Sequence, residues 1–423
     1  MAPHPHFILP GSVADAMAVS GAPWGSFGVK YVPGEELYVI SWYTRKQDVK
    51  LPASTPWLDS HYSRGASVNP GIGFWYRADA DLTLSWEGIW HRRVSVPIDA
   101  FREHIRGWQA PGNATVPVLT VTEIDGAEVW RAWLINNEIA SPLQLEVVSE
   151  STDIYSIYRG VWPLDLLAGE LVTVIGAGSI GSAVAEGLIE YGIRKLALVD
   201  YDRLQFHNLA RHRLLAKDIG RLKVTALRDF LLERDPKAQI DALPFDVTED
   251  ANMIRPLLKQ SNLLIVTSDG VASRRAANHL ASWAGTPTIF ACVLEDGGIG
   301  EILRVKPGVT SCLLCFREKL AAEGSLDPEP DIDRGYGTGN RHLLMTAVGG
   351  DLDLVGKLAA KAAVATLLER RGYLEQRLPG DHAVLGLQPP LALPAPFDVS
   401  RAGEIKWSET GSPRANCPSC RAI

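Results

Sequence analysis

The stretch Val174–Ser182, VIGAGSIGS, follows an apolar run and opens a predicted helix over Ile180–Tyr191. Gly176 and Gly178 permit a tight turn with close approach of a ligand to the backbone, and Gly181 allows the helix to pack closely on a sheet. The free N–H groups at the start of such a helix bind phosphate. Because many unrelated proteins contain this spacing of glycines, it predicts a phosphate-binding turn without deciding which nucleotide is bound.

Apolar runs on either side of this turn predict a Rossmann-like, doubly wound α/β domain over residues 161–423. The runs ELVTVIG, KLALVD, LLIVTSD and PTIFACV are too continuous for strands with one exposed face, and helical stretches separate them. Parallel strands that are buried on both faces have this composition. We therefore expect a parallel sheet with helices on both sides.

Residues 1–160 differ in composition and predict a smaller α+β domain. Short strand-like pieces, ELYVISWYT, VPVLTVTEI and EVWRAWLI, alternate with Pro/Gly turns, and a helix is expected near Asp99–Trp108. Ten of the twelve tryptophans lie between Trp24 and Trp162, and we expect most of them in the core or in interfaces. Since no nucleotide motif accompanies them, we interpret this part as an accessory binding domain.

The composition indicates a globular protein of two domains, with 423 residues, 46% hydrophobic and 22% charged side chains and a formal net charge of −7. No apolar run is long enough to span a bilayer, and the amino terminus has no basic region followed by an apolar core. The acidic balance argues against nucleic acid or a membrane surface as a partner. We therefore expect a cytoplasmic protein.

Four of the five cysteines form two CxxC pairs, Cys312 with Cys315 and Cys417 with Cys420. Thiolates at this spacing are typical ligands of a structural Zn²⁺, whose closed tetrahedral shell leaves no position for chemistry. Two disulfides or unrelated thiols are the alternatives. The pairs are 102 residues apart, so a shared metal would tie the end of the chain to the body of the domain.

Asp200 ends the second apolar run, 24 residues after Gly176. A carboxylate at this position can accept hydrogen bonds from the hydroxyls of a ribose. On the glycine turn and Asp200 alone, an NAD-dependent oxidoreductase remains an alternative.

The segment VDYDRLQFHNLARHRLLAKDIGRLKV adds Asp202, Asn208, Arg211 and Lys223 beyond the end of that strand. Hydride transfer does not need these side chains, whereas transfer of an adenylyl group needs cations against a triphosphate and a carboxylate for Mg²⁺. Arg211 and Lys223 are the candidate catalytic cations. Asp269, at the end of the run LLIVTSD, is the candidate Mg²⁺ ligand.

Taken together and in this order, these motifs resemble the ThiF/MoeB and ubiquitin-activating-enzyme superfamily, over about Leu171 to Cys420. Its members adenylate the C-terminal carboxylate of a ubiquitin-like or sulfur-carrier protein. The resemblance implies ATP as the nucleotide and assigns nucleotide, phosphate or Mg²⁺ contacts to the glycine turn and to Asp200, Asp202, Asn208, Arg211, Lys223, Asp269 and Arg274. Gly270, where relatives often have asparagine, is a mild departure.

The resemblance implies attack of the carrier's carboxylate on the α-phosphorus of ATP and release of pyrophosphate. A C-terminal carboxylate is ionised at neutral pH, so no general base is expected. A peptide C-terminus as substrate and a scaffold that binds a carrier without chemistry are the remaining alternatives.

Two further features bear on the comparison with this superfamily. Several members form a thioester through a cysteine after the first CxxC pair, but Phe316–Asn416 contains no cysteine, and Cys292 lies too early. We therefore expect adenylation without a covalent intermediate.

Relatives often supply an arginine from a partner subunit just before the first strand, where this chain offers Arg159. A homodimer is the default expectation.

The segment WEGIWHRRVSVPIDA faintly resembles the zinc-binding segment of JAB/MPN isopeptidases. His91 matches one metal ligand, but Arg93 stands where a second histidine is needed. A cation in place of a ligand opposes Zn²⁺ binding, so the resemblance implies a degenerate relative at most.

Overall fold

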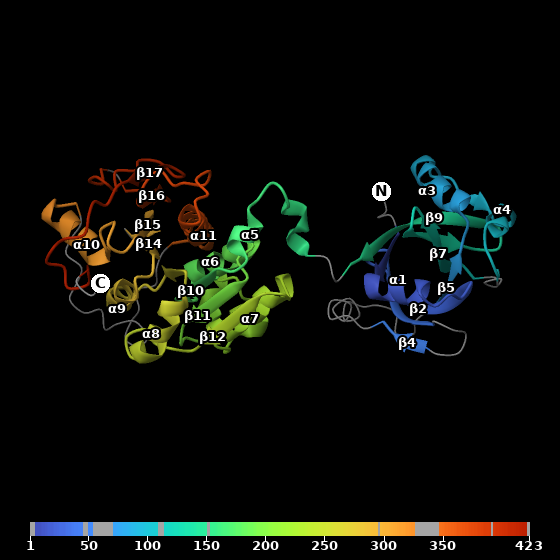
Figure 1. Ribbon diagram of the computed structural model, residues 1–423, viewed down its shortest axis with the longest axis horizontal. Helices are drawn as coiled ribbons and strands as arrows, with labels where there is room; N and C mark the ends of the chain where they lie inside the picture. Colours follow the sequence, from blue (N-terminus) through green and yellow to red (C-terminus); the bar gives the residue numbers. More distant parts are fainter. Residues whose placement is uncertain are drawn as a thin grey trace. The chain divides into compact units, whose positions relative to one another are not determined.

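A computed structural model describes residues 5–44, 50–53, 71–108, 114–149, 153–294, 297–325, 347–390 and 392–420. The chain divides into two compact units, Met1–Asp153 and Ile154–Ile423, which Figure 1 shows in blue to teal and in green to red. Among the described helices, none has the length and apolar character needed to cross a membrane. The polar stretch DPEPDIDRGYGTGNRH, residues 327–342, whose composition predicts a loop, lies outside the described residues.

The first unit is built on a sheet that closes on itself. Its strand order is β1-β3-β2-β5-β7-β8-β9-β6, with β4 paired to β3 and β1 also paired to β9. β1 forms parallel pairs with both β3 and β9, and this double pairing joins the two ends of the series. The strands are β1 (His6–Pro10), β2 (Trp24–Val32), β3 (Leu37–Thr44), β4 (Lys50–Pro52), β5 (Gly71–Arg77), β6 (Val96–Pro97), β7 (Val116–Ile124), β8 (Ala127–Ile135) and β9 (Ile139–Val148).

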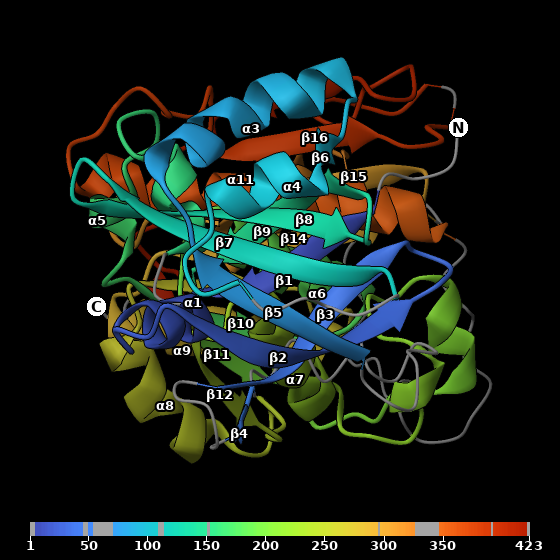
Figure 2. The same ribbon diagram turned by 90° about the vertical axis from the view of Figure 1, so that its right-hand side faces the viewer.

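Helices cover both faces of this sheet, α1 (Gly11–Ala18) on one and α3 (Ala80–Arg92) with α4 (Ile98–Glu103) on the other. Trp75 and Tyr76 are adjacent on β5 and point to opposite faces, so they enter the two different cores. Figure 2 shows α3 and α4 lying along the β7–β9 strands. Trp75, Trp130 and Trp133 are buried, as expected for core tryptophans.

The predicted helix near Asp99–Trp108 is shorter in the structure and ends at Glu103. The chain leaves the helix because Ile105 forms a bridge with Ala78, and Gly107 has a φ of 71°. The predicted strands VPVLTVTEI and EVWRAWLI are confirmed as β7 and most of β8.

The second unit contains an eight-stranded sheet of order β12-β11-β10-β13-β14-β15-β16-β17. The first five strands in this order are parallel. Four of them, β10, β11, β13 and β14, are the predicted apolar runs, whereas β12 was not predicted. The last three are antiparallel and were not predicted. The strands are β10 (Leu171–Ile175), β11 (Lys195–Val199), β12 (Gln239–Leu243), β13 (Leu263–Val266), β14 (Thr288–Leu294), β15 (Ile299–Val305), β16 (His382–Gly386) and β17 (Ile405–Ser408).

Two helical layers cover this sheet. One core packs α6 (Ser179–Glu190), α7 (Lys223–Arg234) and α11 (Gly349–Arg370) against it, and the other packs α8 (Ala251–Gln260), α9 (Val271–Ala284) and α10 (Leu313–Ala322). From β10 the chain proceeds outward through β11 to β12 and then returns to the other side of β10 at β13. This reversal is the switch point at which doubly wound sheets bind ligands.

The second unit begins at Ile154, several residues before the boundary that the sequence predicted after residue 160. A short 3₁₀ helix, η1 (Ile154–Tyr158), precedes α5 (Leu164–Leu167). Tyr155 is buried, and its hydroxyl donates to the backbone carbonyl of Ile189 on α6. This anchor attaches the segment to the second unit.

Candidate nucleotide site

A cavity of about 350 Å³ opens at the switch point of the second unit. The ends of β10, β11, β13 and β14 and the first turns of α6 and α9 contribute to its wall. The predicted site residues that line it are Gly176, Gly178, Asp200, Asp202, Asn208, Arg211, Lys223, Asp269 and Arg274. The fold therefore gathers side chains from Gly176 to Arg274 in one cavity.

Gly181 does not line the cavity but supports the turn from behind. A Cβ atom at this position would overlap the carbonyl oxygen of Gly176. Gly176 has a φ of 94°, which a residue with a side chain rarely adopts. Thr267 Oγ1 donates to the Gly176 carbonyl at 2.8 Å, so β10 and the segment after β13 are joined at the turn.

The Asp200 carboxylate stabilises the glycine turn by accepting hydrogen bonds from backbone N–H groups. Its Oδ2 accepts the N–H of Ala177 at 2.7 Å, and its Oδ1 accepts the N–H of Asp202 at 2.8 Å. Burial raises the pKa of this carboxyl, and the neighbouring Lys223 acts in the opposite direction. Each oxygen retains acceptor capacity that a ribose hydroxyl could use.

His212 also supports the turn, and the sequence reasoning did not single it out. Leu214 N–H donates to Nδ1 at 3.1 Å, so Nε2 carries the proton and donates to the Ala177 carbonyl at 2.8 Å. Burial lowers the pKa of His212 to about 4, which keeps the ring neutral. The one feature of the sequence that could have identified His212 is its position directly after Arg211. A histidine in a predicted loop belongs to no periodic pattern that would mark it.

Lys223, Asp202, Asn208 and Arg211 line the cavity together. Lys223 begins α7, is buried, and donates from Nζ to Asp202 Oδ2 at 2.8 Å. Asp202 thus contacts the lysine directly. Asn208 Oδ1 accepts the N–H of Gln205 at 2.9 Å and so stabilises η2 (Phe206–Ala210), after which Arg211 follows.

Asp269 and Arg274 line the cavity from other elements, after β13 and in the first turns of α9. Burial raises the pKa of the Asp269 carboxyl, while Lys223 and Arg274 favour its charged form. A divalent cation would favour that charged form further. Arg274 Nη1 lies 3.6 Å from Cys292 Sγ.

Cys292 lines the cavity but is unsuited to nucleophilic attack. Burial and the nearby Glu301 carboxylate raise the pKa of its thiol to about 11. Its Sγ donates to Glu301 Oε2 at 3.4 Å. Because the thiolate is the reactive form, this environment opposes thioester formation. Arg159 is exposed and is not among the residues that line the cavity.

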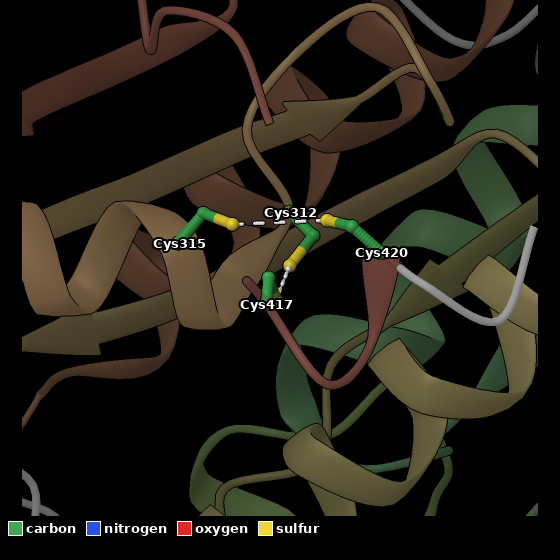
Figure 3. A group of neighbouring side chains, drawn as sticks. All are labelled: Cys312, Cys315, Cys417 and Cys420. Atoms are coloured by element: carbon green, nitrogen blue, oxygen red, sulfur yellow. Dashed lines mark hydrogen bonds between the residues drawn. The ribbon is translucent and has the colours of Figure 1, made fainter. Parts of the chain in front are cut away.

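The four CxxC cysteines converge on one point (Figure 3). Their sulfur atoms all lie within 4.8 Å of one another, with Cys312 3.6 Å from Cys417 and Cys315 3.7 Å from Cys420. A tetrahedral zinc site with Zn–S bonds of about 2.3 Å has sulfur–sulfur edges of about 3.8 Å, whereas a disulfide bond is about 2.05 Å long. The cluster therefore fits a four-thiolate metal site.

The site joins distant parts of the chain. Cys312 caps α10 and Cys315 lies on it, while Cys417 and Cys420 belong to the segment after β17. The backbone N–H of Arg414 donates to Cys315 Sγ at 3.4 Å. Within the described ranges this is the one group of three or more His, Cys, Asp or Glu side chains close enough to share a metal ion.

His91 has a position unlike that of a metal ligand. It lies exposed in the last turn of α3, and Arg93 is the left-handed residue that ends this helix. The expectation that this segment does not bind Zn²⁺ remains a prediction.

Comparison with known proteins assigns the second unit to a family. The ThiF family profile matches residues 164–375, half of the chain. The chain is 32% identical over 162 residues to ubiquitin-like modifier-activating enzyme 5 of Caenorhabditis elegans, covering 36% of this chain and 39% of the relative. It is 30% identical over 156 residues to the sulfur carrier protein ThiS adenylyltransferase of Bacillus subtilis, covering 36% and 45%. The matched part thus spans less than half of these relatives.

Among solved structures, the microcin C7 biosynthetic enzyme MccB in complex with N-formylated MccA aligns with 61% of this chain and 69% of its own, at 20% identity and a TM-score of 0.47. A TM-score of this size does not by itself support a common fold.

Proposed function

This chain belongs to the ThiF family, and from that premise we propose that it uses ATP to adenylate the C-terminal carboxylate of a ubiquitin-like or sulfur-carrier protein. The observation that carries the proposal is the meeting, in one cavity, of the glycine turn with three cationic side chains and a carboxylate: Arg211, Lys223, Arg274 and Asp269. A dinucleotide-dependent hydride transfer would not need this charge arrangement.

In the proposed reaction, a carboxylate oxygen of the acyl substrate forms a bond to the α-phosphorus of ATP. The bond from that phosphorus to the bridging oxygen breaks, and its electron pair leaves with pyrophosphate. The nucleophile needs no general base, because a C-terminal carboxylate is already ionised at neutral pH. Catalysis then depends on positioning and on neutralising the charge that develops on pyrophosphate.

The residues divide this work. The N–H groups at the start of α6 and the glycine turn bind phosphate, and Asp200 contacts the ribose. Arg211, Lys223 and Arg274 face the triphosphate, and Asn208 maintains the loop that carries Arg211. Asp269 would hold Mg²⁺, which when bound withdraws charge from the phosphoryl oxygens.

The names of the relatives support a small carrier protein as the acyl substrate. We propose adenylation without a thioester on Cys292, since that thiol is partly buried and its pKa is raised. The four-cysteine cluster would hold a structural Zn²⁺, because its sulfur spacing matches a tetrahedral shell. The first unit would serve as a binding module for the carrier or a partner, and a homodimer would allow Arg159 to act across an interface.

Exchange of radiolabelled pyrophosphate into ATP tests the proposal. We expect exchange only when a carrier with a free C-terminus is added, and we expect Asp269→Ala to reduce it at least about 100-fold. Asp398→Ala is the matched control, because this carboxylate is exposed and pairs with Lys406 away from the cavity.

Near-normal exchange by Asp269→Ala would contradict the assignment of Asp269 as the Mg²⁺ ligand. Carrier binding without exchange in the wild-type protein would indicate a scaffold, and a change in NADH absorbance without any need for ATP would indicate an oxidoreductase.

A further inference from the structure

A chain of contacts leads from the cavity into the core of the second unit and ends on a buried carboxylate, Glu301. Arg274 Nη1 lies 3.6 Å from Cys292 Sγ, and the Cys292 thiol donates to Glu301 Oε2 at 3.4 Å. Cys292 and Glu301 are paired residues on the neighbouring strands β14 and β15. The sheet itself therefore fixes the distance between thiol and carboxylate.

Glu301 is 2% exposed and charged. Burial opposes its ionisation, but Arg317 and His382 overcome that effect and hold the pKa of the Glu301 carboxyl well below its usual range. Arg317 donates from both guanidinium ends, with Nη1 2.8 Å from Oε1. His382 Nε2 lies 3.0 Å from the same Oε1.

These contacts make Glu301 a rigid anchor. A buried carboxylate with a bidentate arginine and two further donors has one favourable geometry, and removing a partner is strongly unfavourable. Arg317 belongs to α10, the helix that also carries Cys315 of the cysteine cluster. The anchor is thus attached to three elements, β15, α10 and β16.

We propose that Glu301 is a positioning residue that, through the Cys292 thiol, holds the Arg274 side chain in place for the triphosphate. The inference rests on the proposed function. An arginine side chain has about 2 kcal/mol of rotamer entropy to lose on binding. Restricting it beforehand strengthens binding of the phosphate groups, and adenosine, which has no phosphate, gains nothing from this restriction.

The test compares two ligands, ATP with Mg²⁺ and adenosine, in competition with a fluorescent ATP analogue. We expect Cys292→Ala to weaken ATP binding about 10-fold, the effect of losing one hydrogen bond to a charged group. Adenosine affinity is expected to stay within about twofold. Cys292→Ser is expected to restore ATP affinity, since a hydroxyl can accept from Arg274 and donate to Glu301.

Glu301→Gln is the second variant and is expected to show the same selective loss of ATP affinity. Its control is Glu170→Gln, because Glu170 is an equally buried carboxylate that accepts Arg371 Nε at 2.7 Å and does not line the cavity. The control is expected to lose stability while its ratio of ATP to adenosine affinity remains that of the wild type.

Equal loss of ATP and adenosine affinity in Cys292→Ala, or no loss of either, would overturn the positioning role. A wild-type protein that binds no ATP would overturn the proposed function together with this inference. If the wild-type protein binds ATP and Cys292→Ala binds it equally tightly, only this inference is overturned.

Discussion

Replacing Gly181 with alanine is expected to displace the glycine turn. The new Cβ would overlap the carbonyl oxygen of Gly176, and it would lie 2.9 Å from that carbonyl carbon and 2.7 Å from Thr267 Oγ1. Thr267 cannot rotate away freely, because its hydroxyl donates to the Gly176 carbonyl at 2.8 Å. The backbone must therefore move.

The size of the movement sets the size of the effect. Carbon and oxygen atoms without a bond approach to about 3.3 Å, so the contact with Thr267 alone requires a shift of roughly 0.6 Å. Adding a methyl group to a packed region costs about 1–3 kcal/mol of unfolding free energy. A misplacement of about 1 Å lowers a reaction rate by about 100-fold, so we expect exchange to fall 10- to 100-fold.

The assay combines chemical denaturation with pyrophosphate exchange in three alanine variants. Gly178→Ala places its Cβ in open space at the cavity wall, so we expect reduced exchange at unchanged stability. Gly169→Ala also meets no neighbouring atom but does not line the cavity, so neither quantity is expected to change. Full stability and full exchange in Gly181→Ala would refute the argument from close contact.

Two other predictions concern pH and metal. Because burial lowers the pKa of His212 to about 4, its stabilising effect is complete above the unfolded pKa of about 6.5 and is lost as the pH falls through 4. The loss is about 3 kcal/mol, and denaturation curves of His212→Gln should show a smaller acid slope than the wild type. Metal analysis should find one zinc per chain, and Cys417→Ser should lose both the metal and thermal stability. Cys292→Ala, outside the cluster, should retain its zinc, and a metal-free wild-type protein would contradict the site.

Much of the second unit follows from local pattern. Continuous apolar runs predicted its parallel strands because both faces of such strands are buried, and the glycine spacing predicted the turn at Gly176. The antiparallel strands β15–β17 escaped prediction, since their pairing depends on segments far apart in the chain. The closure of the first unit's sheet through β1 was not predicted either, because it pairs residues near His6 with residues near Gln144.

Residue types and their order along the chain already predicted the chemical groups of the site, from the glycine turn through Lys223 and Asp269 to the two CxxC pairs. The contacts of each group depend on the folded chain: Lys223 pairs with Asp202, His212 supports the turn, and the Cys292 thiol donates to Glu301. Residue type and spacing fix only the local geometry of the chain. Burial and hydrogen-bond partners, which set charge and reactivity, arise only where distant segments pack together.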